Sequence, residues 1–314
     1  MKSNISIQRT TAPIPSPKLK TQRYKRAKVN VQAWLLLLPS LIFLGIFTIY
    51  PIIKTIYLSF FHLNLAHHTP EFAGFSNYSE LFSNKVFHKV LLNTFLFAIG
   101  TVPTSMALGL GMAIFVNKAI KAKGWVRTLF FYPVVIPMIA VANFWLFIYT
   151  PNYGLLDKFL HLFGAGAHNW LGDPGKVLPA MMFMMMWKQA GFLMVFYLAG
   201  LQNISTELYE AADIDGANAW HKFRKITFPL LMPTTLFVFI ISLTNSFKIV
   251  DHIVIMTQGG PDNASNLLLY YIYETAFQFL DKGMAATLTV ILIVILFVLS
   301  VINFISTDRR IHYS

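Results

Sequence analysis

Six long runs of apolar residues limit what this chain can fold into. They cover residues 31–59, 91–116, 128–149, 177–201, 230–250 and 284–305. A run of about 18 or more apolar residues can cross roughly 30 Å of hydrocarbon as an α-helix. The runs do not alternate polar and apolar residues, which is the pattern of strands in a membrane barrel. The sequence therefore predicts an all-α, polytopic membrane protein with six transmembrane helices.

The amino-acid composition agrees with this prediction and excludes several classes of protein. Only 12% of the 314 residues are charged and 56% are hydrophobic, whereas soluble domains carry about 25% charged residues. A soluble two-domain enzyme, a disordered chain and a fibrous protein are therefore excluded. The chain contains no cysteine, so it has no disulfide, no thiolate metal site and no cysteine nucleophile.

The basic residues predict how the runs are oriented in the membrane. The net charge is +12, and most Lys and Arg outside the runs fall near the N-terminus, in the second and fourth connections and at the C-terminus. Because Lys and Arg concentrate on the cytoplasmic side of membrane proteins, we expect both termini to be cytoplasmic. This topology explains the basic excess, and no nucleic-acid partner is needed. We expect residues 1–30 to be a flexible basic cytoplasmic tail, residues 31–306 the transmembrane domain and residues 307–314 a cytoplasmic C-terminal tail.

The chain lacks the local patterns of catalytic, metal and nucleotide sites. Gly175 and Lys176 form a Gly-Lys pair, but Trp170 stands where a phosphate-binding loop has its first glycine. The metalloprotease pattern HExxH and the hydrolase pattern GxSxG are absent. His67 and His68 are interpreted as a solvated pair in an outer loop. We therefore expect no catalytic residue, no metal ligand and no cofactor in this chain.

The fourth connection, residues 203–229, has the pattern of two short helices joined by a turn. Ser205 or Thr206 is suited to cap a first helix that carries acidic residues in its early turns. Gly216 permits a tight reversal, and residues 217–226 carry apolar residues with helical spacing. We expect a cytoplasmic helix–turn–helix elbow whose small residues allow close approach of another protein. An amphipathic loop without a partner is the alternative.

The elbow also resembles a family motif. Glu210, Ala211 and Ala212, followed by Gly216 and a closing Pro229, resemble the EAA loop that marks the membrane subunits of binding-protein-dependent ABC importers. The residue before the proline is phenylalanine, where leucine is usual. The resemblance implies that the elbow docks into a groove of a separate ATPase subunit, which binds ATP and Mg²⁺. It implies these contact residues: Glu210, Ala211, Ala212, Asp213, Asp215, Gly216 and Ala217.

Most of the chain after residue 30 resembles the carbohydrate-type permeases related to the maltose and glycerol-phosphate systems. The segment that contains Gly259, Gly260 and Pro261 is typical of the first of the two paired permeases. The resemblance implies a bacterial or archaeal cytoplasmic (inner) membrane. It implies as partners a homologous second permease, two ATP-binding subunits, an extracytoplasmic solute-binding protein and a sugar or sugar-phosphate substrate. Gly259, Gly260 and Pro261 are candidates for an outer gate or a binding-protein contact, and a simple connector is an equal alternative.

Polar residues inside the apolar runs are candidates for the substrate pathway. A charge in the hydrocarbon core costs about 2.5–3.5 kcal/mol or more, so Lys188, near the middle of the fourth run, is expected to face a polar cavity or the bundle interior. The resemblance to maltose-type permeases implies that the fourth to sixth spans line the pathway. The candidates are Asn143, Lys188, Gln189, Thr244, Asn245, Ser246 and Lys248. Hydrogen bonding between helices or to the partner permease is the alternative interpretation.

These features together predict a non-catalytic permease subunit of an ATP-driven importer of oligosaccharides, disaccharides or glycerol 3-phosphate. A self-sufficient secondary transporter or channel is the alternative, but an ion-coupled transporter is expected to carry an acidic residue within the membrane. None of the six runs contains Asp or Glu. A membrane-embedded enzyme is less favoured because no catalytic pair occurs. Neutral sugars and sugar phosphates are equally compatible with the sequence.

Overall fold

The computed structural model describes residues 34–63, 69–118, 122–164 and 166–308. The chain divides into two compact units, Met1–Lys54 and Thr55–Ser314, and each is described by itself. The predicted tail of residues 1–30, most of the predicted C-terminal tail of residues 307–314, and the pair His67 and His68 lie outside the described residues.

The first apolar run forms one helix, Trp34–Leu58. It contains a wider turn, η1 (Gly45–Ile49), before α2 (Tyr50–Leu58), and the Tyr50 N–H donates to the Gly45 carbonyl five residues earlier. Pro51 follows directly and has no N–H to donate, so a normal helical hydrogen bond is missing at this point. A π-type turn is one of the ways in which a helix accommodates such a gap.

The unit Thr55–Ser314 is almost entirely helical. The two strands among its described residues are short and pair antiparallel, with Phe61 opposite Phe72. The first elements are β1 (Phe61–His62), β2 (Glu71–Phe72), α3 (Ser76–Ser83), α4 (Lys85–Asn117), α5 (Lys123–Val135), α6 (Met138–Ile148), α7 (Leu155–His161) and α8 (Val177–Gln202). The remaining elements are α9 (Thr206–Ile214), α10 (Ala219–Lys222), η2 (Phe223–Thr227), α11 (Phe228–Leu230), α12 (Met232–Ser246), α13 (Asp251–Met256), α14 (Leu268–Phe277) and α15 (Lys282–Asp308).

Four helices of the described chain are long and apolar enough to cross a membrane, and two bent pairs raise the total to six. The all-α prediction is thus confirmed, but the third predicted span is not a continuous helix: it is bent by 97° between α5 and α6. A second bend, of 66° between Ala219–Leu230 and α12, lies at the start of the fifth predicted span, which α12 occupies from Met232 to Ser246. At the first break Ile136 is extended and Pro137 precedes α6. A residue before proline is disfavoured in the helical conformation, which explains why α5 stops there.

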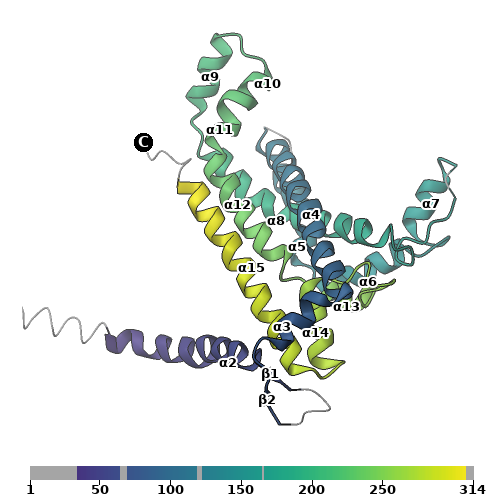
Figure 1. The fold of residues 1–314 in the computed structure, drawn as a ribbon. Coiled ribbons are helices and arrows are strands. Elements are labelled where there is room, and N and C mark those ends of the chain that lie inside the picture. Colours follow the sequence, from purple (N-terminus) through teal and green to yellow (C-terminus); the bar gives the residue numbers. More distant parts are fainter. Residues whose placement is uncertain (1–33, 64–68, 119–121, 165, 309–314) are drawn as a thin grey trace, which may run out of the picture. The chain divides into compact units, whose positions relative to one another are not determined.

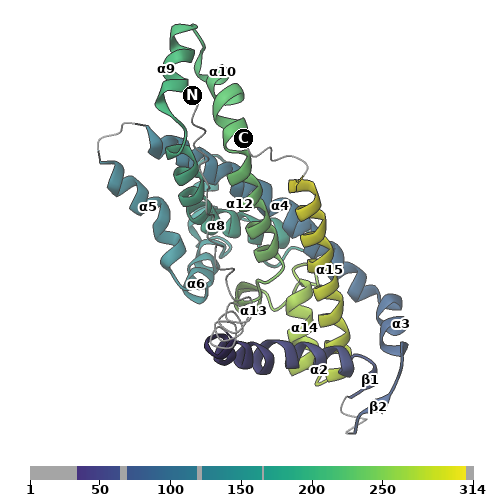
Figure 2. The ribbon, with the colours of Figure 1, turned by 90° about the vertical axis from the view of Figure 1, so that its left-hand side faces the viewer.

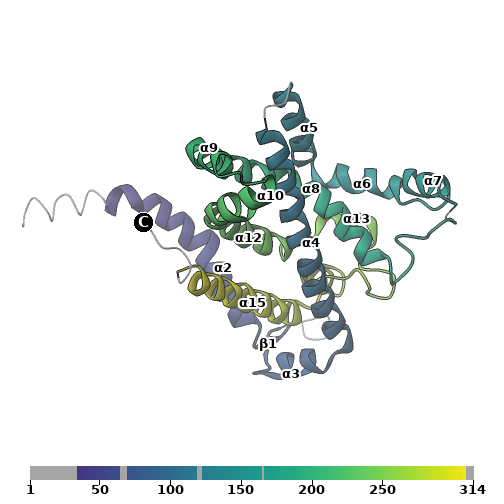
Figure 3. The ribbon, with the colours of Figure 1, turned by 90° about the horizontal axis from the view of Figure 1, so that it is seen from above.

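The helices of this unit pack around α4 and α8, which lie side by side (Figure 1). α12 packs against both of them. α5 and α15 lie on opposite sides of the group that α4, α8 and α12 form (Figures 2 and 3). The α9–α10 pair lies at one end of the unit, and β1, β2 and α14 lie at the other end (Figures 1 and 2).

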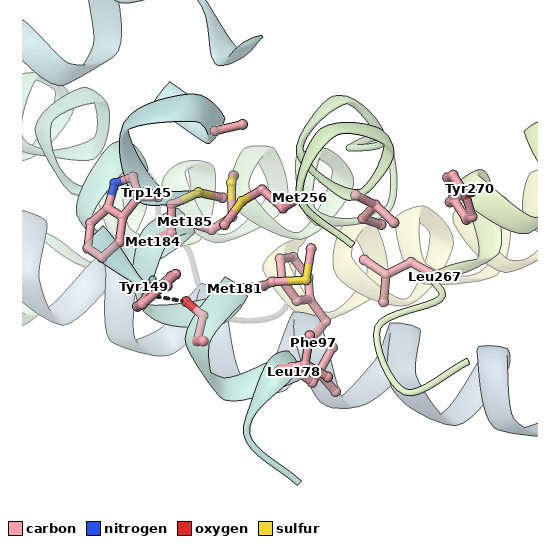
Figure 4. Close-up of a cluster of buried hydrophobic side chains, with 14 of the residues drawn as sticks. Phe97, Trp145, Tyr149, Leu178, Met181, Met184, Met185, Met256, Leu267 and Tyr270 are labelled. Carbon is pink, nitrogen blue, oxygen red and sulfur yellow. Dashed lines mark hydrogen bonds between the residues drawn. The ribbon is translucent and has the colours of Figure 1, made fainter. Parts of the chain in front are cut away.

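The largest buried cluster joins α4, α6, α8 and α13 (Figure 4). Phe97, Trp145 and Met181 are among its side chains, and each is at most 7% exposed. The buried Tyr149 hydroxyl donates to the Ala180 carbonyl at 2.7 Å, so its polar end is satisfied inside an apolar cluster. This cluster fixes α6 against α8 despite the break that precedes α6.

Candidate functional site: a helical elbow and a polar pocket

The fourth connection forms two helices joined by a turn, which we call the elbow (residues 203–229). Ser205 is the N-cap of α9, and its hydroxyl accepts the Glu207 N–H at 3.2 Å. α9 ends at a left-handed Gly216, with φ of +73°, and the Ala217 N–H returns to the Ala212 carbonyl at 2.9 Å. A side chain with a Cβ is strained in this conformation, which explains the glycine.

The second helix of the elbow begins two residues later than the sequence predicts and contains a π-type turn. α10 starts at Ala219, and the helix continues through η2 and α11 to Leu230. The turn precedes Pro229, in the same way that η1 precedes Pro51. Asn218 caps α10 by accepting the His221 N–H at 2.8 Å.

Two side-chain contacts brace the elbow internally. The Lys222 ammonium pairs with Asp213 at 2.6 Å and links α10 to α9. The Tyr209 and Thr227 hydroxyl groups form a hydrogen bond of 2.9 Å across the elbow. Asp213, a predicted docking residue, therefore has a partner inside the elbow. Contacts within this chain therefore help to hold the two helices of the elbow together.

The tip of the elbow exposes small, acidic and apolar side chains together. Glu210, Ala211, Asp215 and Gly216 are exposed, and Ala212 and Ala217 are half-buried. A hollow of about 450 Å³ lies beside the turn, and these residues line it: Ala212, Asp215, Gly216, Ala217, Asn218, His221, Lys225 and Ile226. Ile214 is 87% exposed. The sequence analysis missed Ile214, although an isoleucine between two aspartates at a helix end is an unusual position for an apolar residue.

The second candidate site is a pocket of about 400 Å³ beside the middle of α8. Its lining comes from α5, α6, α8, the end of α12 and the segment that leads into α13: Val134, Met138, Met185, Lys188, Gln189, Phe192, Asn245, Lys248, Ile249 and Asp251. Four predicted pathway residues, Lys188, Gln189, Asn245 and Lys248, thus meet in one place. Asp251 was not predicted, because it lies just beyond the fifth apolar run.

Three other predicted pathway residues do not line this pocket. Asn143 donates to the Ile139 carbonyl four residues earlier in its own helix, at 2.8 Å. Ser246 is buried and donates to the Leu243 carbonyl at 2.7 Å. Thr244 is half-buried and lies outside the pocket lining. Asn143 and Ser246 therefore each donate a hydrogen bond within their own helices.

Lys188 has a structural partner as well as a place in the pocket. Its ammonium donates to the Pro133 carbonyl at 3.1 Å and to the Ile136 carbonyl at 2.8 Å. In a continuous helix the N–H of residue 137 would donate to the Pro133 carbonyl, but Pro137 has no N–H. Lys188 supplies the missing donor at the break between α5 and α6. A broken helix is tolerated inside a membrane when a neighbouring helix replaces the lost backbone hydrogen bonds in this way.

Replacing Lys188 with methionine is expected to lower transport and to loosen the α5–α6 break while the chain still inserts in the membrane. The substitution leaves two backbone carbonyls without a donor, and each unsatisfied buried group costs about 1–3 kcal/mol. The thermal unfolding midpoint of the purified transporter should fall by several degrees. Lys248→Met is the matched control, because Lys248 lines the same pocket but contacts neither carbonyl. Equal unfolding midpoints for the two variants would contradict the structural role of Lys188.

Comparison with known proteins shows the family. Residues 105–312 match the family described as "Binding-protein-dependent transport system inner membrane component". This chain belongs to that family. The matched residues contain both the elbow and the pocket, and they make this chain a multi-pass membrane permease. The alternative of a self-sufficient secondary transporter or channel is not supported by this match.

Relatives match this permease over most of its length. The sulfoquinovosyl glycerol transport system permease protein SmoG of Agrobacterium fabrum is 33% identical and aligns over 83% of this chain and 85% of its own length. The probable starch degradation products transport system permease protein AmyD of Thermoanaerobacterium thermosulfurigenes is 31% identical over 92% of this chain and 98% of its own length. The crystal structure of a bacterial ABC transporter involved in the import of alginate contains a chain with the same fold: its TM-score is 0.79, its identity is 24%, and the match covers 92% of this chain and 99% of that one.

The predicted outer segment of the permease is fastened to the start of α4. Lys89 contacts both the carbonyl and the carboxylate of Asp262, with 2.8 Å between the charged groups. Asn93 donates to the Asn263 carbonyl at 2.8 Å and to the Asn266 carbonyl at 3.2 Å. The hydrogen bond from Lys89 and its charge lower the pKa of Asp262. These contacts join the chain around residues 259–266 to a long helix.

The turn itself is held by its own polar groups. Gly259 has a positive φ, the bond between Gly260 and Pro261 is cis, and the Ser265 hydroxyl donates to the Gly260 carbonyl at 2.6 Å. The predicted residues Gly259, Gly260 and Pro261 thus form an ordered turn. Whether this turn acts as a gate or a binding-protein contact stays a prediction.

A buried acid that the sequence analysis missed organises the connection between α6 and α8. Asp157 is fully buried and accepts hydrogen bonds from the Asn152 N–H at 2.9 Å, the His168 N–H at 3.1 Å and the Trp170 indole at 2.8 Å. Burial raises the pKa of Asp157, but the three hydrogen bonds outweigh it, and the net shift of the pKa is downward. The only sequence signal was an acidic residue at the start of a short helix.

Proposed function

We propose that this permease forms half of the solute pathway of an ATP-driven sugar importer. Its partners are a homologous permease, two ATPase subunits that hold ATP and Mg²⁺, and an extracytoplasmic binding protein. The permease itself performs no bond chemistry. The basic residues support a topology in which both termini and the elbow face the cytoplasm of a bacterial or archaeal cell.

One observation carries the proposal: the elbow and the pocket are built on the same two helices. The elbow joins the end of α8 to the start of α12 through α9, α10 and α11. α8 supplies Lys188 and Gln189 to the pocket, and the far end of α12 supplies Asn245. A force applied at the elbow therefore acts directly on the helices that line the pocket.

The exposed tip of the elbow is suited to be the docking surface for the ATPase subunit. Ile214 offers an apolar side chain to a groove, and Glu210 and Asp215 offer charge for orientation. Apolar residues surrounded by charge are typical of docking surfaces, because the apolar contact supplies affinity and the charges fix the register. We propose that ATP-driven closure of the ATPase subunits moves the elbow and switches the pocket between inward and outward access.

The relatives support a sugar or sugar derivative as the solute. SmoG is named for sulfoquinovosyl glycerol, which carries a sulfonate, and AmyD is named for starch degradation products, which are neutral. Both relatives are permease proteins that are similar to this chain over most of its length. The relatives therefore support the sugar class and leave its charge open.

A single cysteine tests the docking of the elbow. The chain has no native cysteine, so Ala211→Cys places the only thiol of the permease on the exposed tip. In membranes that contain the complete transporter, a short thiol-directed crosslinker should join this permease to the ATPase subunit. Ser83→Cys, at the end of α3 and also exposed, is the matched control and should give no such product. An active transporter in which Ala211→Cys never captures the ATPase would contradict the proposal.

A further inference from the structure

The pocket beside α8 has an unbalanced charge. Two ammonium groups, from Lys188 and Lys248, line it together with one carboxylate, from Asp251. Gln189 and Asn245 add amide groups that can donate or accept hydrogen bonds. The remaining lining is apolar. With the three charged groups ionised, the pocket carries one positive charge in excess.

Among the residues that the structure describes, neither ammonium forms an ion pair with a carboxylate. In the described residues, the Lys–carboxylate pairs join Lys89 to Asp262, Lys176 to Asp173 and Lys222 to Asp213. Lys188 and Lys248 do not pair with Asp251 or with another carboxylate anywhere in that part of the chain. Lys188 is half-buried in the middle of α8, whereas Lys248 is exposed beyond the end of α12. An ammonium inside a membrane bundle that lacks a counter-ion, as Lys188 does, is unfavourable and is normally found where a function requires it.

Lys188 holds its charge at a fixed position. Two of its three N–H groups are directed to the Pro133 and Ile136 carbonyls, which leaves one donor for another acceptor. Carbonyl groups satisfy hydrogen bonds but do not neutralise the ammonium charge. A rigidly held cation beside a cavity is a preorganised receptor for an anion, because little reorganisation is needed when the anion arrives.

The size of the pocket suits a solute that is more than a bare ion. About 400 Å³ lies within the range of small-molecule pockets in proteins. The apolar lining that includes Phe192 and Met185 can contact a sugar ring, and the amides can contact hydroxyl groups. Lysine ammonium groups bind phosphate, sulfonate and carboxylate groups as point charges.

We propose that the solute of this permease is an anionic sugar derivative, whose phosphate, sulfonate or carboxylate group is recognised by Lys188 and Lys248. The inference rests on the proposed function, since it assigns a charge class to the same solute pathway. Asp251 limits the excess charge to that of a single negative group. The neutral di- and oligosaccharides that some relatives carry lack the group that this pocket is built to neutralise.

The test uses the complete transporter in proteoliposomes, with ATP supplied to the ATPase subunits and the cognate binding protein present. Uptake is measured for matched pairs of probes: glycerol 3-phosphate and glycerol, glucose 6-phosphate and glucose, and glucuronate and glucose, with maltose as a neutral disaccharide. At least one anionic probe should be taken up and its neutral partner should not. Preferred uptake of maltose or of another neutral probe would overturn the inference and leave the proposed importer intact.

Charge variants show whether the selectivity lies in this chain or only in the binding protein. For the best anionic probe, Lys248→Gln should raise KM about tenfold, and the effect should shrink as salt increases. Asp251→Asn, which also removes one charge from the same pocket, should leave KM unchanged or lower it. Equal changes in KM for the two variants would overturn the inference. A wild-type transporter that takes up no probe in response to ATP would instead overturn the proposed function.

Discussion

Replacing Glu210 with lysine is expected to reduce ATP-driven uptake to about one-tenth or less while the permease still inserts and folds. Glu210 is exposed on α9, and it makes no hydrogen bond or ion pair within the residues that the structure describes. Its replacement therefore costs little folding energy. At a docking surface, however, reversing a charge disrupts complementarity and costs about 2 kcal/mol or more, which is roughly thirtyfold in affinity.

The measurement compares uptake with ATP hydrolysis in the same proteoliposomes. Glu210→Lys should lose uptake and the stimulation of hydrolysis by loaded binding protein, while the amount of permease in the membrane is unchanged. Glu207→Lys is the matched control, because it makes the same charge change one turn earlier on the same exposed helix. If the two variants behave alike, or if Glu210→Lys transports normally, the docking surface does not include Glu210.

Gly191→Ala is expected to have the largest effect on stability. Gly191 lies in α8 against α5, and a Cβ built on it would be 2.1 Å from the Phe130 carbonyl oxygen and 3.3 Å from a Val134 methyl group. The nearest atom, the Phe130 carbonyl oxygen, belongs to the backbone and cannot move away by a change of rotamer, as a side chain can. The two helices would have to separate, and overpacking of this kind costs about 1–3 kcal/mol. Separation would also pull the α5 carbonyls away from Lys188, three residues earlier in α8.

Thermal unfolding of the purified permease complex measures this effect. The midpoint for Gly191→Ala should fall by several degrees, and the yield of folded protein should fall with it. Gly111→Ala is the matched control: Gly111 is also inside a membrane helix, but a Cβ there meets nothing within 4 Å. Alanine is favoured over glycine in helices by about 1 kcal/mol, so this variant should be neutral or stabilised. A loss of stability shared by both variants would show that packing at Gly191 is not the cause.

The positions of the helices were predictable because the membrane requires long apolar segments, and length can be read from the sequence. The breaks were not. α4 continues through Pro103, whereas the chain bends by 97° next to Pro137. Both prolines remove a backbone donor, so proline alone does not decide the outcome. At Pro137 the Pro133 carbonyl, which has lost its helical donor, accepts a hydrogen bond from the Lys188 ammonium of another helix. A tertiary contact of this kind is not visible in the local sequence.

The elbow was largely predictable because its capping signals are local. Ser205, one of the two predicted capping residues, caps α9, and Gly216 forms the predicted turn. The π-type turn at residues 223–227 of the second helix, before Pro229, was not predicted. The pocket was predictable only in part. The sequence shows that a residue is polar and deep in a span, but the rotation of each helix decides whether the side chain faces a cavity, as Lys188 does, or its own helix, as Asn143 does.

Given the proposed role of Lys188 in solute binding, its two hydrogen bonds restrict how the selectivity of this permease can be re-engineered. A substitution of Lys188 that admits a different solute would also remove the two hydrogen bonds at the break between α5 and α6. It would therefore require a second substitution that restores a donor there. Lys248 and Asp251 line the same pocket but do not donate to the Pro133 or Ile136 carbonyl. Variants and natural descendants with altered cargo should therefore diversify first at these two positions, while position 188 keeps a long side chain that can donate.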